Sequence, residues 1–242
     1  SGGKMIIAGI NTSGTLNLSH VTIQNVNDNN SIGGAINVSS SSGTTLTDCV
    51  IRQCRSLLGS AIMINGGGDP EKSAIRITNS TITQCISGGD YSGGANTGGA
   101  IRTYGSVKSN LYLTNVTMSY NYAMREYTGY NNTLQMDGNG GALFWNGRGE
   151  EETACYVDGC LFEHNISDDN GGAIKSQGSL YFVKNPTTIQ NNQAPNGAGL
   201  YIEGYTGGVT TGVRTIDYDL NENLVVKNNI SPAYNHKGEN NP

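Results

Sequence analysis

A four-residue phrase recurs along this chain of 242 residues, at intervals of a few tens of residues. It reads Gly-Gly-Ala followed by Ile or Leu, at residues 33–36, 98–101, 140–143 and 171–174, with looser copies at 59–62 and 197–200. Recurrence at such a period marks a stack of similar structural units, none of which can bury its apolar face alone. The phrase therefore predicts a solenoid.

A second pattern lies between the glycine phrases. It reads apolar-x-apolar, then polar residues, another apolar residue and a final Asn or Cys, for example at residues 75–85 and 111–121. Runs this short, with turns every few residues, do not suit a hairpin meander of ordinary strands. We expect an all-β fold, a right-handed parallel β-helix of about seven coils with loop insertions. Residues 1–242 are expected to form one domain, as a fragment of a longer surface protein.

Aligning the copies predicts three inward columns in which like residues stack. The first column is Ile23, Ile51, Ile82, Met118, Phe162 and Ile189; the second is Leu18, Leu46, Ile77, Leu113 and Val157; the third is Ile36, Ile62, Ile101, Leu143, Ile174 and Leu200. Trp145 is expected in the core beside them. Each buried side chain contributes about 1.5–3 kcal/mol, so the columns are expected to hold the fold.

Polar and sulfur-containing residues also fall into columns. Asp48, Asn79, Asn115 and Gly159 share a bend position, which suits residues that tolerate left-handed backbone. Asn121, Asn165, Asn192 and Asn229 continue a column begun by Cys54 and Cys85, where stacked amides can form hydrogen bonds between coils. The five cysteines are interpreted as buried free thiols, with Cys54 and Cys85 as the pair that stacking brings within bridging range.

Segments longer than the bare repeat are read as insertions, at 66–73, 86–97, 122–139, 146–154 and 203–215. They enter at two points of the repeat, so we expect them along two edges, where loops on a rigid scaffold commonly carry recognition. The formal net charge of -5 comes with no cluster of Lys or Arg. This disfavours nucleic acid and anionic membranes as partners. No apolar run is long enough to span a bilayer, so we expect no membrane insertion by this segment.

The glycine phrase paired with Phe-x-x-Asn resembles the repeat pair of the chlamydial polymorphic outer membrane proteins and of related β-helical, adhesin-like surface proteins. The strict second half is present at residues 162–165, and near copies are 118–121 and 189–192. The resemblance covers about residues 16–229. It implies an extracellular or cell-surface segment used in adhesion, which binds a glycan or protein of a host or neighbouring cell.

Polysaccharide lyases and glycoside hydrolases also use parallel β-helices, so an enzyme is the first alternative. The acidic candidates are the pair Asp168 and Asp169, the run 150–152 beside Arg148, and Asp217 with Asp219. Turn or loop-tip positions are the favoured explanation for them. No metal-ligand spacing and no nucleophile–His–acid arrangement emerges, so we expect no catalysis, no metal and no cofactor. A second alternative is a fibre subunit that associates end to end.

Two outward columns are the candidate binding residues. Tyr112, Tyr156 and Tyr181 share one outward position in successive coils. On the strand after the glycine phrase, Arg102, Phe144, Lys175 and Tyr201 are expected to face outward together, in line with Asn37 and Met63. Such a face suits sugar stacking or a protein partner, although a ladder that only stabilises the sheet fits as well. The loop tyrosines Tyr127 and Tyr130 are further candidates.

Overall fold

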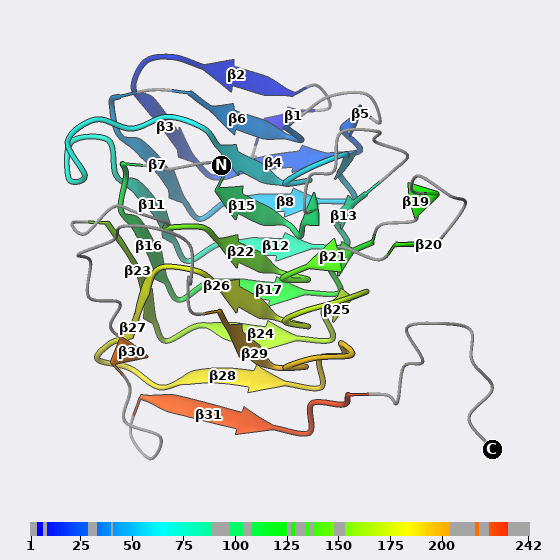
Figure 1. Cartoon of the computed structure of the whole chain (residues 1–242). Helices are drawn as coiled ribbons and strands as arrows, with labels where there is room; N and C mark the ends of the chain where they lie inside the picture. Colours follow the sequence, from blue (N-terminus) through cyan, green and yellow to red (C-terminus); the bar gives the residue numbers. More distant parts are fainter. Residues whose placement is uncertain are drawn as a thin grey trace, which may run out of the picture.

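The computed structural model of the chain is a parallel β-helix (Figure 1). It describes residues 4–6, 9–28, 33–39, 41–88, 97–103, 108–124, 127–128, 134–135, 138–147, 153–203, 216–217 and 223–231. Within these ranges the regular structure is β-strand, and neighbouring strands of the stack pair in parallel. The predicted fold class is confirmed.

Four sheets run along the stack, and successive strands of each sheet come from successive coils. Sheet A contains β1 (Lys4–Ile6), β4 (Val21–Gln24), β8 (Val50–Arg52), β12 (Thr81–Thr83), β17 (Thr117–Ser119), β24 (Leu161–Glu163), β28 (Thr187–Gln190) and β31 (Leu224–Lys227). Sheet B contains β2 (Ile10–Thr12), β6 (Ile36–Val38), β10 (Ile62–Ile64), β15 (Ile101–Thr103), β22 (Leu143–Trp145), β26 (Ile174–Ser176) and β29 (Leu200–Ile202). Sheet C contains β3 (Leu16–Ser19), β7 (Thr44–Thr47), β11 (Ile75–Thr78), β16 (Leu111–Thr114), β23 (Ala154–Asp158), β27 (Ser179–Phe182) and β30 (Ile216–Asp217).

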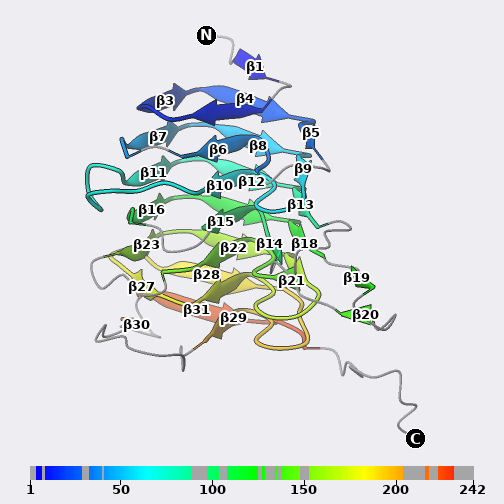
Figure 2. The same cartoon turned by 45° about the horizontal axis from the view of Figure 1, so that its top comes forward.

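Sheet D is narrower and lies between sheets A and B along the chain. It contains β5 (Asn27–Asp28), β9 (Arg55–Ser56), β13 (Ile86–Ser87), β18 (Tyr122–Ala123) and β25 (Ile166–Ser167). Two small pairs stand beside the stack: β14 (Thr97–Gly98) with β21 (Gly138–Asn139) in parallel, and β19 (Tyr127–Thr128) with β20 (Leu134–Gln135) antiparallel. One coil thus runs through sheets C, A, D and B in turn, and Figure 2 shows the coils following one another down the stack.

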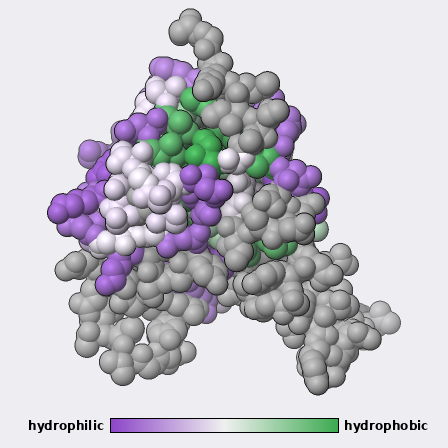
Figure 3. Space-filling view, turned by 90° about the horizontal axis from the view of Figure 1, so that it is seen from above, coloured by the Kyte–Doolittle hydropathy of each residue, from purple (hydrophilic) through white to green (hydrophobic). Residues whose placement is uncertain are grey.

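The strand register confirms the three inward columns. In sheet A, for example, Ile82 pairs with Ile51 on one side and with Met118 on the other. Members of the columns in the middle coils are 0–2% exposed, and Trp145 is fully buried among them. At the ends of the described stack the same columns open, since Ile10, Leu16 and Leu18 are only partly buried and Val226 is 47% exposed. Figure 3, seen from above, shows a patch of hydrophobic surface with polar residues beside it.

Three of the turns between sheets repeat a left-handed residue from coil to coil. Between sheets C and A these residues include Asp48, Asn79, Asn115 and Gly159, with φ between 50° and 61°, as the sequence predicted. Between sheets A and D they include Gln53, Gln84, Tyr120 and His164, and before sheet B they are glycines of the recurrent phrase. Repeating the same strained position in each coil keeps the corners in register, so the strands can pair.

The asparagine column forms a continuous hydrogen-bonded ladder. Asn165 Oδ1 accepts from the backbone N and from Nδ2 of Asn121, at 3.1 and 3.0 Å, and Asn192 Oδ1 does the same for Asn165. Each Nδ2 also donates to a backbone carbonyl, as Asn165 does to Met118 at 2.9 Å. The amides therefore satisfy buried backbone groups where the chain turns away from the sheet ladder. The predicted amide stacking is confirmed.

Candidate binding surface

The outer face of sheet C carries the three tyrosines of the first candidate column. Tyr112 pairs with Tyr156, and Tyr156 with Tyr181, in the registers of β16, β23 and β27. Their rings are nearly parallel, with centroids 4.8 Å and 5.2 Å apart. All three side chains are half-buried, with their outer edges toward solvent. We call this arrangement the tyrosine ladder.

The upper end of the tyrosine ladder is closed by charged groups. The guanidinium of Arg76 on β11 lies 4.8 Å from the centroid of the Tyr112 ring. Glu71 accepts hydrogen bonds from the hydroxyl of Tyr112, from Asn110 Nδ2 at 2.6 Å and from Arg76 at 2.8 Å. This network fixes the first ring of the ladder.

The insertion 66–73 holds Glu71 in place. Asp69 accepts hydrogen bonds from the backbone N of Glu71 and of Lys72, both at 3.1 Å, which closes a tight turn. Ser73 ties the end of the turn back to the scaffold through the carbonyl of Lys108, at 2.8 Å. An inserted loop thus supplies a carboxylate to the sheet face.

The network changes the protonation behaviour of its members. The hydrogen bond from Tyr112 is the main cause that lowers the pKa of Glu71 below its ordinary value. Burial, together with the hydrogen bond to Glu71, raises the pKa of Tyr112 to about 12. Burial also raises the pKa of Tyr156 above its ordinary value. Tyr112 and Tyr156 are therefore neutral hydroxyls at physiological pH.

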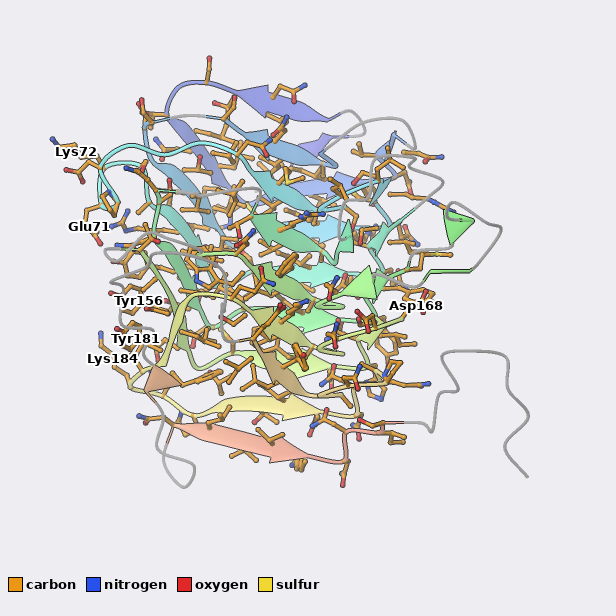
Figure 4. The ribbon with its side chains drawn as sticks, in the orientation of Figure 1. Glu71, Lys72, Tyr156, Asp168, Tyr181 and Lys184 are labelled. Carbon is orange, nitrogen blue, oxygen red and sulfur yellow. The ribbon has the colours of Figure 1, made fainter. Side chains whose placement is uncertain are left out.

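The ladder offers ring edges and hydroxyls, because the ring faces cover one another. Within the part of the chain that the structure describes, the hydroxyls of Tyr156 and Tyr181 have no hydrogen-bond partner, whereas that of Tyr112 is bound to Glu71. Figure 4 shows Glu71, Tyr156, Tyr181 and Lys184 along one edge of the molecule, with Asp168 at the opposite edge. Stacking of a sugar ring between the tyrosines is therefore excluded by their spacing.

The second candidate column is not exposed to solvent, and that prediction is wrong. Arg102, Phe144 and Lys175 are only 5%, 1% and 4% exposed, and Met63 is fully buried. Tyr201, in the last coil of this column, is half-buried. The register itself is as predicted, since Phe144 pairs with both Arg102 and Lys175. The prediction fails because other segments of the chain cover the outer face of sheet B.

The chain that leads into each glycine phrase provides this cover. Leu57 and Leu58, which follow sheet D, form a small apolar cluster with Met63. A Cβ on Gly98 would stand 2.8 Å from the side chain of Arg102, so the backbone there packs directly on it. The buried column packs as alternating cations and rings, with Arg102 and Lys175 each 5.4 Å from the ring of Phe144.

The remaining candidates are the loop tyrosines and the acidic residues. Tyr127 lies on β19, beside the stack, and its side chain is outside the described part, as are Tyr130 and residues 150–152. Asp168 accepts a hydrogen bond from the hydroxyl of Tyr122 at 2.7 Å, and Asp169 is bonded to Asn170. Both carboxylates thus take part in structural contacts. Among the described residues no three His, Cys, Asp or Glu side chains gather as metal ligands.

The five cysteines are buried and free, as predicted. Cys54 and Cys85 lie on neighbouring coils, with a hydrogen bond from the backbone N of Ile86 to the carbonyl of Cys54 at 2.9 Å. The hydrogen bond from Cys85 lowers the pKa of the Cys54 thiol, whereas burial raises that of Cys85 well above its ordinary value. Cys54 also lines an open surface pocket of about 440 Å³ beside Gln53 and Arg55.

Sequence reasoning missed Glu71, Arg76 and Asn110, which complete the upper end of the tyrosine ladder. Arg76 stands in the same outward column as the tyrosines, so the column itself carried that signal. Glu71 comes from an insertion outside the repeat, and only its position within 66–73 pointed to it.

Comparison with known families finds one match. Residues 159–177 match the model of the Chlamydia polymorphic membrane protein repeat, which includes both the Phe-x-x-Asn at 162–165 and the glycine phrase at 171–174. The resemblance seen in the sequence is confirmed in this repeat. No curated protein and no solved structure matches the chain. In the described residues no helix has the length and apolarity needed to cross a membrane.

Proposed function

We propose that this chain is a non-catalytic segment of a cell-surface protein, an adhesin or stalk that binds a glycan or protein of another cell through the tyrosine ladder and the loops beside it. The observation that carries the proposal is the ladder itself. Among the described residues the hydroxyls of Tyr156 and Tyr181 have no hydrogen-bond partner, and they stand in line on a rigid sheet, about one strand spacing apart, near the charged groups of Glu71 and Lys184. The repeat match supports the surface location.

The ladder suits a partner that presents hydrogen-bonding groups in a row. Tyrosine provides large, rigid contact area with little loss of side-chain entropy, and its hydroxyl can donate or accept. Because the strands fix the spacing of Tyr156 and Tyr181, the partner need not order them on binding. An extended polysaccharide edge and an exposed peptide strand both fit this description.

The test compares binding of the purified chain and of variants to a glycan array and to cells. Tyr156→Ser removes the central ring, and Tyr156→Phe keeps the stack but removes the hydroxyl. Tyr120→Ser is a matched control, because Tyr120 is also an exposed, stacked tyrosine, 4.9 Å from His164 at a different corner.

We expect both Tyr156 variants to lose binding at least about tenfold, which corresponds to one hydrogen bond of about 1.4 kcal/mol. Tyr120→Ser should bind like the unmodified chain. Equal binding by all variants would reject the ladder as the site. Cleavage of a polysaccharide by the purified chain would reject the non-catalytic assignment.

A further inference from the structure

Lys175 is a charged residue buried inside the corner between sheets D and B. Its side chain is 6% exposed and lies between two aromatic rings, with Nζ 5.4 Å from the centroid of Phe144 and 5.5 Å from that of Tyr201. Lysines are rarely buried to this degree without specific partners. The partners of Lys175 are therefore informative.

Two groups meet the Lys175 ammonium. Nζ lies 2.7 Å from Oδ1 of Asn139, a side chain that is itself 1% exposed, and 3.0 Å from Oε2 of Glu203. A buried amine and a buried carboxamide thus stand in contact with a carboxylate whose side chain is 36% exposed. These are the nucleophile, the electrophile and the proton acceptor of an amide-forming reaction.

We propose that Lys175 and Asn139 become joined by an intramolecular isopeptide bond, with Glu203 as the general base. Glu203 takes one proton from the Lys175 ammonium, and the free amine attacks Cγ of Asn139. A second proton passes from Nζ to Nδ2 of Asn139, the Cγ–Nδ2 bond breaks, and ammonia leaves. The ammonia takes up the proton held by Glu203, so the products are one secondary amide and one ammonium ion. No oxidant or cofactor is required.

The distances favour this step. Since the Cγ–Oδ1 bond is about 1.2 Å long, the 2.7 Å contact places Nζ within about 3.9 Å of Cγ. Reacting atoms in near-attack geometry stand about 3–3.5 Å apart, so a small displacement suffices. Asn170 Nδ2 donates to the same Oδ1 at 3.2 Å and would stabilise the negative charge that develops on it.

Hydrogen bonds also hold Glu203 in the position of a general base. Its backbone N donates to the carbonyl of Ser176 at 2.9 Å, and its Oε2 accepts from Gln177 Nε2 at 2.6 Å. Both contacts come from residues next to Lys175 in the sequence. The carboxylate therefore keeps its place beside Nζ while the bond forms.

A competing reaction of Asn139 is disfavoured by the fold. Asn139 precedes Gly140, and in flexible Asn-Gly sequences the backbone N of glycine attacks the same carbon to give a succinimide. Here the N of Gly140 donates to the carbonyl of Asn170 at 2.8 Å, in the ladder between coils. That nitrogen is held by its hydrogen bond, whereas the amine of Lys175 is directed at the carboxamide.

The bond would tie two successive coils together. Asn139 belongs to β21 and Lys175 to β26, one coil further along the stack (Figure 1). The link would close a loop from residue 139 to residue 175, and a closed loop restricts the unfolded chain as a disulfide does. Unlike a disulfide it would resist reducing agents.

Mass spectrometry of the full chain tests the proposal. We expect the intact mass to fall by one ammonia, about 17 Da, and a proteolytic digest to contain one branched peptide that joins residues 139 and 175. Lys175→Arg and Glu203→Gln should restore the full mass, whereas the control Lys184→Arg, at an exposed lysine, should keep the loss. Full mass with separate peptides in the unmodified chain would overturn the proposal, even if the variants fail to fold. Loss of ammonia that persists in Lys175→Arg would show the succinimide instead and would overturn it as well.

Discussion

Asn165 supplies one oxygen, Oδ1, to both the backbone N and the Nδ2 of Asn121 on the coil before it, at 3.1 and 3.0 Å. The same relation links Asn192 to Asn165 and Asn229 to Asn192. Each asparagine side chain therefore accepts hydrogen bonds from the coil that precedes it along the chain. Cys85 donates the last such bond, from its backbone N to Asn121 Oδ1 at 3.1 Å. Beyond Cys85 the column continues as Cys54 and Val26, whose side chains have no carboxamide that could extend the ladder.

Asn165→Leu should lower the free energy of unfolding by about 3 kcal/mol or more, since each buried group left without a partner costs about 1–3 kcal/mol. The groups affected are the two donors of Asn121 and the carbonyl of Met118. Urea denaturation followed by circular dichroism measures the change. Asn17→Ala, at an exposed outward position of sheet C, should stay within about 0.5 kcal/mol. A loss no larger in Asn165→Leu than in Asn17→Ala would contradict the role of the ladder.

Gly141→Ala should destabilise the protein by at least about 3 kcal/mol or prevent folding, because overpacking against backbone cannot be relieved by a side-chain shift. A Cβ there would stand 2.2 Å from the carbonyl oxygen of Gly172 and 2.5 Å from that of Ile166. The larger change Gly141→Val should be worse.

Gly14→Ala is the matched control for Gly141, because a Cβ at Gly14 meets nothing within 4 Å. Thermal unfolding and soluble yield should separate the two variants clearly. If Gly141→Ala melted at the temperature of Gly14→Ala, the close approach of the coils at the glycine phrase would be refuted.

The sequence predicted the inward columns because stacking aligns like residues. Each coil repeats the same spacing, so the position of Ile82 fixes its neighbours Ile51 and Met118 without knowledge of the loops. The same argument placed the tyrosines of the ladder in one register. Whatever depends only on the repeat could therefore be read from the chain.

The cover over Lys175 could not be predicted in this way. Sheet D is built from pairs of residues such as Arg55–Ser56, too short to show an alternating pattern. The contacts of Lys175 with Asn139 and Glu203 come from segments that flank the repeat and differ from coil to coil. Periodicity gives no information on such segments, which explains why a column on the covered outer face of sheet B was expected to face solvent.

Titration of Tyr112 should reveal its contact with Glu71. The folded pKa of Tyr112 is raised to about 12, so the neutral form stabilises the fold fully below pH 10 and loses this contribution as pH rises toward 12. Glu71→Gln removes the charge and should shift the pKa of Tyr112 downward, toward its ordinary value. Tyrosinate absorbance at alkaline pH measures the shift, with Glu163→Gln on sheet A as a control. An unchanged titration curve in Glu71→Gln would rule out the contact.

For Glu71 the dependence of stability on pH has the opposite sign, because its folded pKa is lowered. The folded pKa of Glu71 is lowered chiefly by the hydrogen bond from Tyr112, so its contribution is present above the ordinary carboxyl pKa. It is lost as pH falls through the lowered value. Tyr112→Phe should raise the pKa of Glu71, which carboxyl chemical shifts in an NMR titration would detect. Because Glu71 is largely exposed, the effect on stability is expected to be small. A pKa of Glu71 that stays low in Tyr112→Phe would assign the shift to Asn110 and Arg76 instead.

The thiols should react with alkylating agents in a fixed order. Cys54 lines the open pocket, and its pKa is lowered by the hydrogen bond from Cys85. Cys155 lies inside the core, where burial raises its pKa well above the ordinary value. Since the thiolate is the reactive form, Cys54 should be labelled in the native protein well before Cys155. Pulse labelling with iodoacetamide and mass spectrometry measures both rates.

Cys85→Ala provides the decisive variant for this order. Without the Cys85 thiol the pKa of Cys54 should rise, so its labelling rate at neutral pH should fall, while that of Cys155 stays unchanged. In urea both cysteines should react at similar rates, because unfolding removes the pocket and the core alike. Faster labelling of Cys54 in Cys85→Ala would mean that access through the pocket, rather than the hydrogen bond between the two thiols, controls the reaction.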